Sequence, residues 1–176
     1  MGKEKRIAMI TGSFDPVTSG HEDLIIRAAC MFDFVYVAVM SNGEKDSAGS
    51  GLFTYTERLE ILEAALRDIA AEGITNVKAE LCTGLSSDFA RERDVRFIVR
   101  GARGASDFDY EYSLAAIMKR FDPRLETVVL PAMPDLACIS STYVRELLRY
   151  GERIGDAMPP EAADCAVRIY EGKKKR

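Results

Sequence analysis

Three polar clusters each follow a short apolar run, and their residue types suit the binding of phosphate. The first is the turn from Thr11 to His21, TGSFDPVTSGH, which is rich in glycine and ends in the only histidine of the chain. The second is RGAR at 100–103, and the third is ISSTYVRE at 139–146. Glycine turns and helix starts present backbone N–H groups to phosphate, and arginine forks bind it in a bidentate manner. Together the clusters predict a site for a phosphorylated ligand.

Each cluster alone also fits a structural role. The first turn matches neither the G-x-G-x-x-G fingerprint nor a P-loop, so a β-to-α turn capped by Ser19 explains it equally well. RGAR also fits a solvated surface turn, the acids at 107–111 suit a helix N-terminus, and the hydroxyls at 140–142 suit a helix cap. A lone histidine is more often structural than catalytic. His21, however, stands in the phosphate-binding turn, where an imidazole N–H can stabilise a phosphoryl group in transfer.

The elements that must position these clusters alternate along the chain. Short runs rich in Val, Ile and Phe predict strands at 7–10, 34–40, 77–81, 96–99 and 127–130. Helical periodicity predicts helices at 22–32, 55–71, 87–93, 107–121, 141–150 and 160–171. Parallel neighbours need crossover connections, so the alternation predicts an α/β fold with a doubly wound, five-stranded parallel sheet and helices on both faces. Ligands of such sheets bind beyond the carboxyl ends of the strands, where the three clusters stand.

Length and composition predict one domain, 1–176, with a C-terminal helix at about 160–171 and a basic tail at 172–176. Its 47% hydrophobic residues suffice for a core. A net charge of −4 disfavours a general nucleic-acid binder, and the run KKKR at 173–176 is predicted to be a solvated tail.

The spacing of the cysteines and the length of the apolar runs indicate in which cellular compartment the protein works. The four cysteines have neither zinc-type nor redox-type spacing. No apolar run is long enough to span a membrane, and the N-terminus lacks the h-region of a signal peptide. We therefore expect a cytoplasmic protein without nucleic-acid or membrane partners.

Two of the clusters resemble the signatures of the nucleotidyltransferase superfamily. Thr18-x-Gly20-His21 resembles its (H/T)-x-G-H signature, and ISSTYVR at 139–145 resembles its ISS-[ST]-x-x-[RK] signature. The segments FDPVT at 14–18 and RGARGASDFDYEYSLA at 100–115 are similar to the corresponding segments of bacterial phosphopantetheine adenylyltransferases. The resemblance covers nearly the whole chain and implies a Rossmann-like fold.

The resemblance implies transfer of AMP from ATP to 4′-phosphopantetheine, with Mg²⁺ as cofactor and a homohexamer as the assembly. No protein side chain is expected to bind the metal. The implied catalytic residues are His21, which stabilises the transition state, and Lys45, which positions the acceptor phosphate. The implied acceptor-binding residues are Ser13, where the family usually has Thr, Lys45, Ser86 and Arg100. The implied ATP-binding residues are Ser13, Phe14, His21, Gly101, Ala102, Arg103, Glu111, Leu136, Ala137, Cys138, Ile139, Ser140, Ser141 and Thr142.

The chain also departs from the family pattern. DSAGSG is inserted after Lys45, Met118-Lys119 stands where members commonly have Asn-Arg, and residues 136–138 replace an aromatic-Ser-Phe run. These departures leave open a related cytidylyl- or adenylyltransferase with another phosphate-bearing acceptor. A non-catalytic nucleotide-binding module on the same fold is the third alternative.

Overall fold

A five-stranded sheet forms the centre of the protein in the computed structural model, which describes residues 4–41 and 51–175. All neighbouring strands are parallel, and their order is β3-β2-β1-β4-β5. The chain winds outward from β1 to β3 and then returns to β4, so the winding direction reverses between β1 and β4. The strands are β1 (Ile7–Gly12), β2 (Phe34–Ser41), β3 (Val77–Thr83), β4 (Phe97–Ala102) and β5 (Glu126–Pro131).

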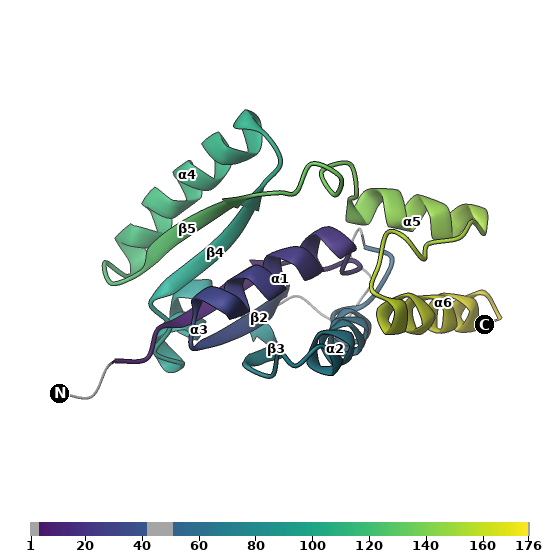
Figure 1. Ribbon diagram of the computed structural model, residues 1–176, viewed down its shortest axis with the longest axis horizontal. Coiled ribbons are helices and arrows are strands. Elements are labelled where there is room, and N and C mark those ends of the chain that lie inside the picture. The colour runs from purple at the N-terminus through teal and green to yellow at the C-terminus, as the bar shows by residue number, and fades with distance from the viewer. Residues whose placement is uncertain (1–3, 42–50, 176) are drawn as a thin grey trace.

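Helices cover both faces of the sheet (Figure 1). Ile25 of α1 and Ile61 of α2 join Val37 of β2 in one apolar core, whereas Phe89 of α3 packs with Met9 of β1 on the other face. The predicted doubly wound α/β fold is therefore confirmed. The helices are α1 (Ser19–Met31), α2 (Tyr55–Ala71), α3 (Ser86–Glu92), α4 (Ala105–Phe121), α5 (Ser141–Tyr150) and α6 (Pro160–Lys174).

The strands extend further at their carboxyl ends than the apolar runs predicted. β1 ends at Gly12 and β4 at Ala102, because the backbone there still pairs with the neighbouring strand. Gly12 pairs with Val39, and Gly101 pairs with Leu130. The second cluster therefore lies largely within β4, at the edge of the sheet where the strands end, and not after the strand.

Local signals explain how the helices around the sheet begin and end. The side chains of Thr54 and Glu57 form a capping box at the start of α2. Gly73, with φ of 94°, follows the end of that helix in a backbone conformation that favours glycine. α6 begins at Pro160 and packs along α2, as Figure 1 shows.

The C-terminal helix is longer than predicted. One residue of the predicted solvated tail, Lys173, is instead bound to the rest of the protein. α6 ends at Lys174 and not at 171. Lys173 donates a hydrogen bond of 3.0 Å to the carbonyl of Leu52 and pairs with the carboxylate of Glu57. These two residues flank the start of α2, so the interaction that fixes Lys173 lies far from it in sequence. None of the helices in the described part of the chain is long and apolar enough to cross a membrane.

Candidate active site

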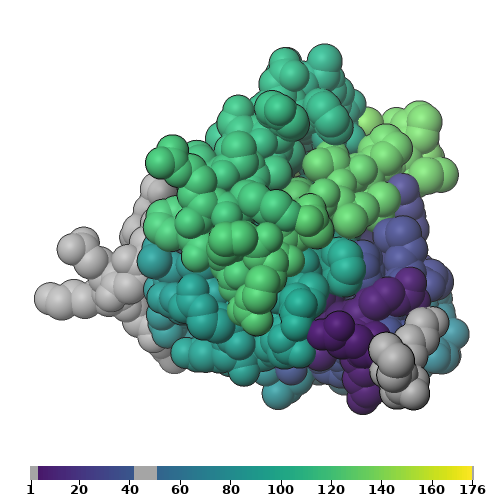
Figure 2. Space-filling view, turned by 90° about the vertical axis from the view of Figure 1, so that its left-hand side faces the viewer, coloured from purple at the N-terminus to yellow at the C-terminus, as the bar shows by residue number. Residues whose placement is uncertain are grey.

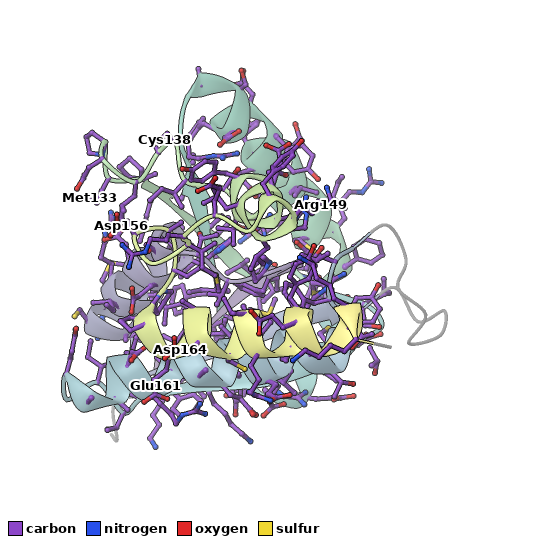
Figure 3. All side chains as sticks on the ribbon, turned by 90° about the vertical axis from the view of Figure 1, so that its right-hand side faces the viewer. Met133, Cys138, Arg149, Asp156, Glu161 and Asp164 are labelled. Atoms are coloured by element: carbon purple, nitrogen blue, oxygen red, sulfur yellow. The ribbon has the colours of Figure 1, made fainter. Side chains whose placement is uncertain are left out.

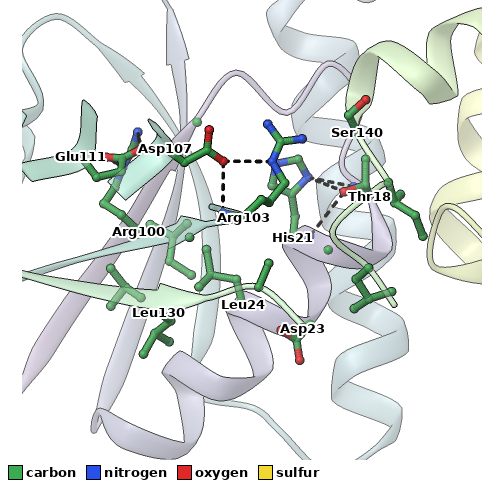
Figure 4. Close-up of a pocket in the computed structure, with 18 of the residues that line it drawn as sticks. Thr18, His21, Asp23, Leu24, Arg100, Arg103, Asp107, Glu111, Leu130 and Ser140 are labelled. Carbon is green, nitrogen blue, oxygen red and sulfur yellow. Dashed lines mark hydrogen bonds and ion pairs between the residues drawn. The ribbon is translucent and has the colours of Figure 1, made fainter. Parts of the chain in front are cut away.

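A cavity of about 440 Å³ opens at the carboxyl ends of β1, β4 and β5, where the winding direction of the sheet reverses. It is lined by the turn after β1, the start of α1, the end of β4 and the segment before α5 (Figure 4). The location agrees with the rule that ligands of open α/β sheets bind at such a reversal. The predicted site residues that line it are Ser13, Phe14, His21, Arg100, Gly101, Arg103, Glu111, Leu136, Ile139, Ser140 and Ser141.

Other predicted site residues lie outside this lining. Ala102 is buried at the end of β4, and Ala137 and Thr142 neighbour lining residues without lining the cavity. Cys138 faces a second cavity, beside the α5–α6 face that Figure 3 shows. Ser86 begins α3, and its hydroxyl contacts the Met118 sulfur of α4 at 3.5 Å. Lys45 lies outside the described residues.

His21 belongs to the first turn of α1, because this helix begins at Ser19 and not at 22. The cap is Thr18, which corrects the expectation of a cap at Ser19. The N–H of Thr18 donates to Nδ1 of His21 at 3.0 Å, and the Thr18 hydroxyl accepts from the His21 N–H. The imidazole thus takes the place that Glu or Gln has in a capping box. Nδ1 acts as the acceptor, so the ring proton is on Nε2.

The surroundings of His21 keep its ring neutral. Burial, and secondarily the positive charge of Arg103, lower the pKa of His21 to about 4. The ring of Phe14 packs edge-on against it, with centroids 5.1 Å apart. Phe14 has φ of 43°, an uncommon conformation for a non-glycine residue, and a Cβ on Gly12 would come within 3.2 Å of its ring. His21 is therefore a fixed, uncharged N–H donor at the cavity wall.

Both arginines of the second cluster are paired with carboxylates of α4 (Figure 4). Arg100 donates to both carboxylate oxygens of Glu111, at 2.6 and 2.9 Å. Arg103 donates to Asp107 at 3.1 Å through Nε, and its backbone N–H binds the same carboxylate oxygen. These hydrogen bonds, of which the backbone one is the larger cause, lower the pKa of Asp107. The cavity wall thus carries two arginines in fixed orientations.

The third cluster supplies a helix N-terminus to the cavity. Its hydroxyls are engaged by the protein, since Ser140 accepts from the Tyr143 N–H and Ser141 donates to the Pro16 carbonyl at 2.8 Å. The backbone N–H groups of the first turn of α5 have no partner within the helix. The start of α5 therefore presents N–H groups and the positive end of a helix dipole to an anion, whereas the N–H groups of Ser19 and His21 in α1 already bind the Ala157 carbonyl and Thr18.

A buried ionic cluster holds the turn that carries His21. The carboxylate of Asp15 accepts from the backbone N–H groups of Leu52 and Phe53, at 3.1 and 3.0 Å. It also pairs with Arg58 of α2 at 3.4 Å and with Arg145 of α5 at 3.7 Å. Arg145, part of the ISSTYVR signature, donates to the Asp15 carbonyl at 2.7 Å. This signature arginine thus binds the first cluster and joins it to the third.

Sequence reasoning missed several residues of this site. Asp107, at first interpreted as a helix-start acid, lines the cavity and orients Arg103. Asp23 and Arg27 of α1 also line it, and Arg27 donates to both Asp23 and the Pro131 carbonyl. Their i, i+4 spacing on a helix predicts an ion pair, which is the one signal that could have found them.

Comparisons with known proteins agree with this geometry. The sequence pattern of the family described as cytidylyltransferase-like matches residues 9–147. The phosphopantetheine adenylyltransferase of Heliobacterium modesticaldum is 41% identical over 154 residues, which cover 88% of this chain and 86% of that protein. The phosphopantetheine adenylyltransferase of Streptococcus equi subsp. zooepidemicus is 39% identical over 170 residues, covering 97% and 98% of the two chains. This chain therefore belongs to the cytidylyltransferase-like family of nucleotidyltransferases, in its phosphopantetheine adenylyltransferase branch.

Solved structures support the fold. A protein of Vibrio parahaemolyticus assigned as a nicotinate-nucleotide adenylyltransferase has a TM-score of 0.69 at 18% identity, with 94% of this chain and 93% of that one covered. A bifunctional NMN adenylyltransferase/ADP ribose pyrophosphatase of Francisella tularensis has a TM-score of 0.66 at 15% identity, covering 98% of this chain and 50% of that one. At these identities the likeness extends to the Rossmann-like fold alone.

Proposed function

We propose that this protein transfers AMP from ATP to 4′-phosphopantetheine, giving dephospho-coenzyme A and pyrophosphate. The observation that carries the proposal is one cavity in which His21, Arg103 and Ser140 meet, in a chain 41% identical to a phosphopantetheine adenylyltransferase. The three residues come from the starts of α1 and α5 and the end of β4, and their donors converge on one anionic ligand. Such an arrangement suits a polyphosphate.

The proposed reaction is a single in-line displacement. An oxygen of the acceptor phosphate attacks the α-phosphorus of ATP, and the bond to the oxygen bridging the β-phosphate breaks, so pyrophosphate leaves. The acceptor phosphate is a nucleophile at neutral pH, and catalysis then needs alignment and charge stabilisation more than a general base. The neutral Nε2–H of His21 donates to the equatorial oxygens on which negative charge grows.

The residues divide between the two substrates. We assign Ser13, Lys45, Ser86 and Arg100 to the acceptor. The ATP side comprises Ser13, Phe14, His21, the run 101–103, Glu111 and the segment 136–142. The support for this assignment is the resemblance to the family, together with the cavity that Arg100, Leu136, Ile139 and Ser140 line.

Mg²⁺ is the proposed cofactor, bound through the triphosphate of ATP. The carboxylates that line the cavity, Asp23, Asp107 and Glu111, are each paired with an arginine. Among residues 4–41 and 51–175 no group of three or more His, Cys, Asp or Glu side chains is placed to hold a metal ion. The pairing of the three carboxylates with arginines fits a metal that arrives with its nucleotide and would supply charge neutralisation there.

We propose that the protein works in the cytoplasm as a homo-oligomer, a hexamer by its resemblance to the family. The four cysteines, Cys30, Cys82, Cys138 and Cys165, are free, as in a reducing compartment. α4 buries only Glu111 among its residues and exposes five large apolar or aromatic side chains. So many large exposed apolar or aromatic side chains on one helix favour a surface that packs against another chain. The exposed residues that form it are Phe108, Tyr110, Tyr112, Ile117 and Phe121.

Figure 2 shows this face of the molecule, with the green atoms of α4 and β5 across its upper part. β5 is an edge strand of the sheet, and none of its residues is fully buried. A second copy of the chain packed here would cover both the helix and the strand edge. This supports self-association through the α4–β5 face.

The test of the proposed function is a matrix of nucleotides and acceptors with the purified protein. We expect pyrophosphate release with ATP and 4′-phosphopantetheine together and not with either alone. Turnover of CTP with glycerol phosphate or choline phosphate instead would contradict the proposal. The alternative, a related transferase with another acceptor, is motivated by Met118, which contacts Ser86 at the predicted pantetheine side. It predicts release of pyrophosphate from ATP with a different phosphate-bearing acceptor.

A further inference from the structure

Glu111 is the one buried residue of α4, and both of its carboxylate oxygens bind Arg100. Its side chain is 9% exposed, whereas that of Asp107, one turn earlier on the same helix, is 38% exposed. A carboxylate at this depth needs a charged partner, because burial without one is costly. Glu111 is therefore bound to a single arginine in a defined geometry.

The hydrogen bonds of Arg100 leave it little freedom. Its Nε and Nη2 donate to Glu111, and its Nη1 donates to both the carbonyl and the hydroxyl of Thr11, at 2.6 and 2.8 Å. Four of the five N–H groups of the guanidinium are thus engaged, and one on Nη2 remains for a ligand. Thr11 belongs to β1 and Glu111 to α4, so the guanidinium is held from both sides.

This arrangement has two opposed consequences for a phosphate in the cavity. The negative charge of Glu111 offsets the positive charge of Arg100, which weakens long-range attraction of an anion. The bidentate pair also fixes the plane of the guanidinium, so the free N–H is presented in one direction without loss of side-chain entropy on binding. Which effect prevails decides whether Glu111 helps or hinders the binding of the acceptor.

We propose that Glu111 is a positioning residue for Arg100, and that it strengthens acceptor binding by orienting the remaining N–H toward the acceptor phosphate. The inference rests on the proposed function, in which Arg100 binds the acceptor. It gives Glu111 a role that acts through Arg100, in addition to its place on the ATP side of the cavity. The fixed geometry outweighs the lost attraction because a phosphate at hydrogen-bond distance gains more from an aligned donor than from distant charge.

The test is Glu111→Gln, which keeps the size of the side chain and one acceptor oxygen but removes the charge. Positioning predicts that the KM for 4′-phosphopantetheine rises about tenfold or more, and by a larger factor than the KM for ATP. Charge alone predicts the opposite sign, a lower KM for the acceptor. Asp109→Asn removes the same charge from an exposed position of α4, and we expect wild-type KM values for both substrates.

A double-mutant cycle with Arg100→Lys shows whether Glu111 acts through Arg100. In the variant that already carries Arg100→Lys, the additional effect of Glu111→Gln on the acceptor KM should largely vanish. The same rise with and without Arg100→Lys would overturn the inference, as would an unchanged or lower acceptor KM in the single variant.

A readout independent of turnover is the Nε–H resonance of Arg100 in NMR spectra of the full chain. We expect it to exchange slowly with solvent in the wild type and in Asp109→Asn, and rapidly in Glu111→Gln. Slow exchange in Glu111→Gln would contradict the inference even if the protein used another acceptor. Absence of wild-type turnover with 4′-phosphopantetheine would contradict the proposed function and leave this readout to decide on Glu111.

Discussion

At the residue scale, the tautomer and charge of His21 define what the site can do. The ring accepts from Thr18 through Nδ1, so Nε2 carries the proton, and a pKa of about 4 keeps the ring neutral at physiological pH. A neutral imidazole donates a hydrogen bond but does not act as a cationic acid. Stabilisation of charge, and not proton transfer, is the chemistry that this residue supports.

Replacement of His21 by alanine is expected to lower kcat about a hundredfold or more, the effect of removing one donor from developing charge. The binding of ATP should persist, because Arg103 and the N-terminus of α5 remain in place. Pyrophosphate release measures the first effect, and isothermal titration with ATP measures the second. Unchanged turnover in the alanine variant would remove His21 from the mechanism.

The low pKa of His21 also makes stability depend on pH. The unfolded chain binds a proton at a pKa near 6.5 and the folded chain only near 4, so the unfolded state holds more protons between these values. Stability contributed by His21 is therefore present above pH 6.5 and is lost as pH falls toward 4. Between about pH 7 and pH 5 the contribution of His21 to the free energy of unfolding falls by about 2 kcal/mol.

The measurement is urea unfolding at about pH 7 and about pH 5 for the wild type and His21→Gln. Other titrating groups contribute nearly equally to both proteins. The free energy of unfolding of the wild type should therefore fall by about 2 kcal/mol more than that of the variant between these two pH values. Equal losses would show that the imidazole is not held neutral by the fold.

At the scale of elements, Asp15 joins the turn after β1 to α2, to α5 and to the segment 52–53. The segment 52–53, α2 and α5 each bind the Asp15 carboxylate, and α5 also binds the Asp15 backbone carbonyl. Because both Asp15 and Arg58 are buried, the cluster is sensitive to the loss of one partner.

We expect Asp15→Asn to lower the free energy of unfolding by about 3 kcal/mol or more, since Arg58 would be left buried without its counter-charge. Urea denaturation measures the change. Arg67→Gln is the matched control, because it breaks the exposed pair with Glu161 and should cost less than about 1 kcal/mol. A loss in Asp15→Asn no larger than in this control would contradict a structural role for the cluster.

At the scale of the whole molecule, α4 connects the site to the outer surface. Its inner side holds Glu111 against Arg100, and one flank carries Ile117 and Phe121, about half exposed at 48% and 53%. An assembly through this helix would therefore pack directly behind the arginines of the cavity. This links the proposed oligomer to the geometry of the site.

The substitution Phe121→Glu is expected to weaken self-association, because a buried charge at an apolar interface is costly. Sedimentation velocity at several protein concentrations measures the mass. Tyr150→Glu, at the end of α5 and 82% exposed, is the matched control and should leave the mass unchanged. Dissociation by the control and not by Phe121→Glu would place the interface elsewhere.

The order of strands and helices and the three polar clusters could be predicted from the amino-acid sequence, because these signals lie within a few residues of one another. Periodicity, the capping box at Thr54 and Glu57, and the two signatures required no knowledge of distant contacts. The family followed from the same local patterns.

The contacts between these parts could not be predicted from the sequence, because they depend on how the chain folds in three dimensions. Arg145 meets Asp15 across 130 positions of sequence, Arg100 meets Thr11 across 89, and Lys173 meets Glu57 across 116. Such pairs form because the carboxyl ends of parallel strands gather at one edge of the sheet and because α6 packs along α2. Local sequence contains the residues of each pair but not the distance between them, which depends on how the whole chain packs.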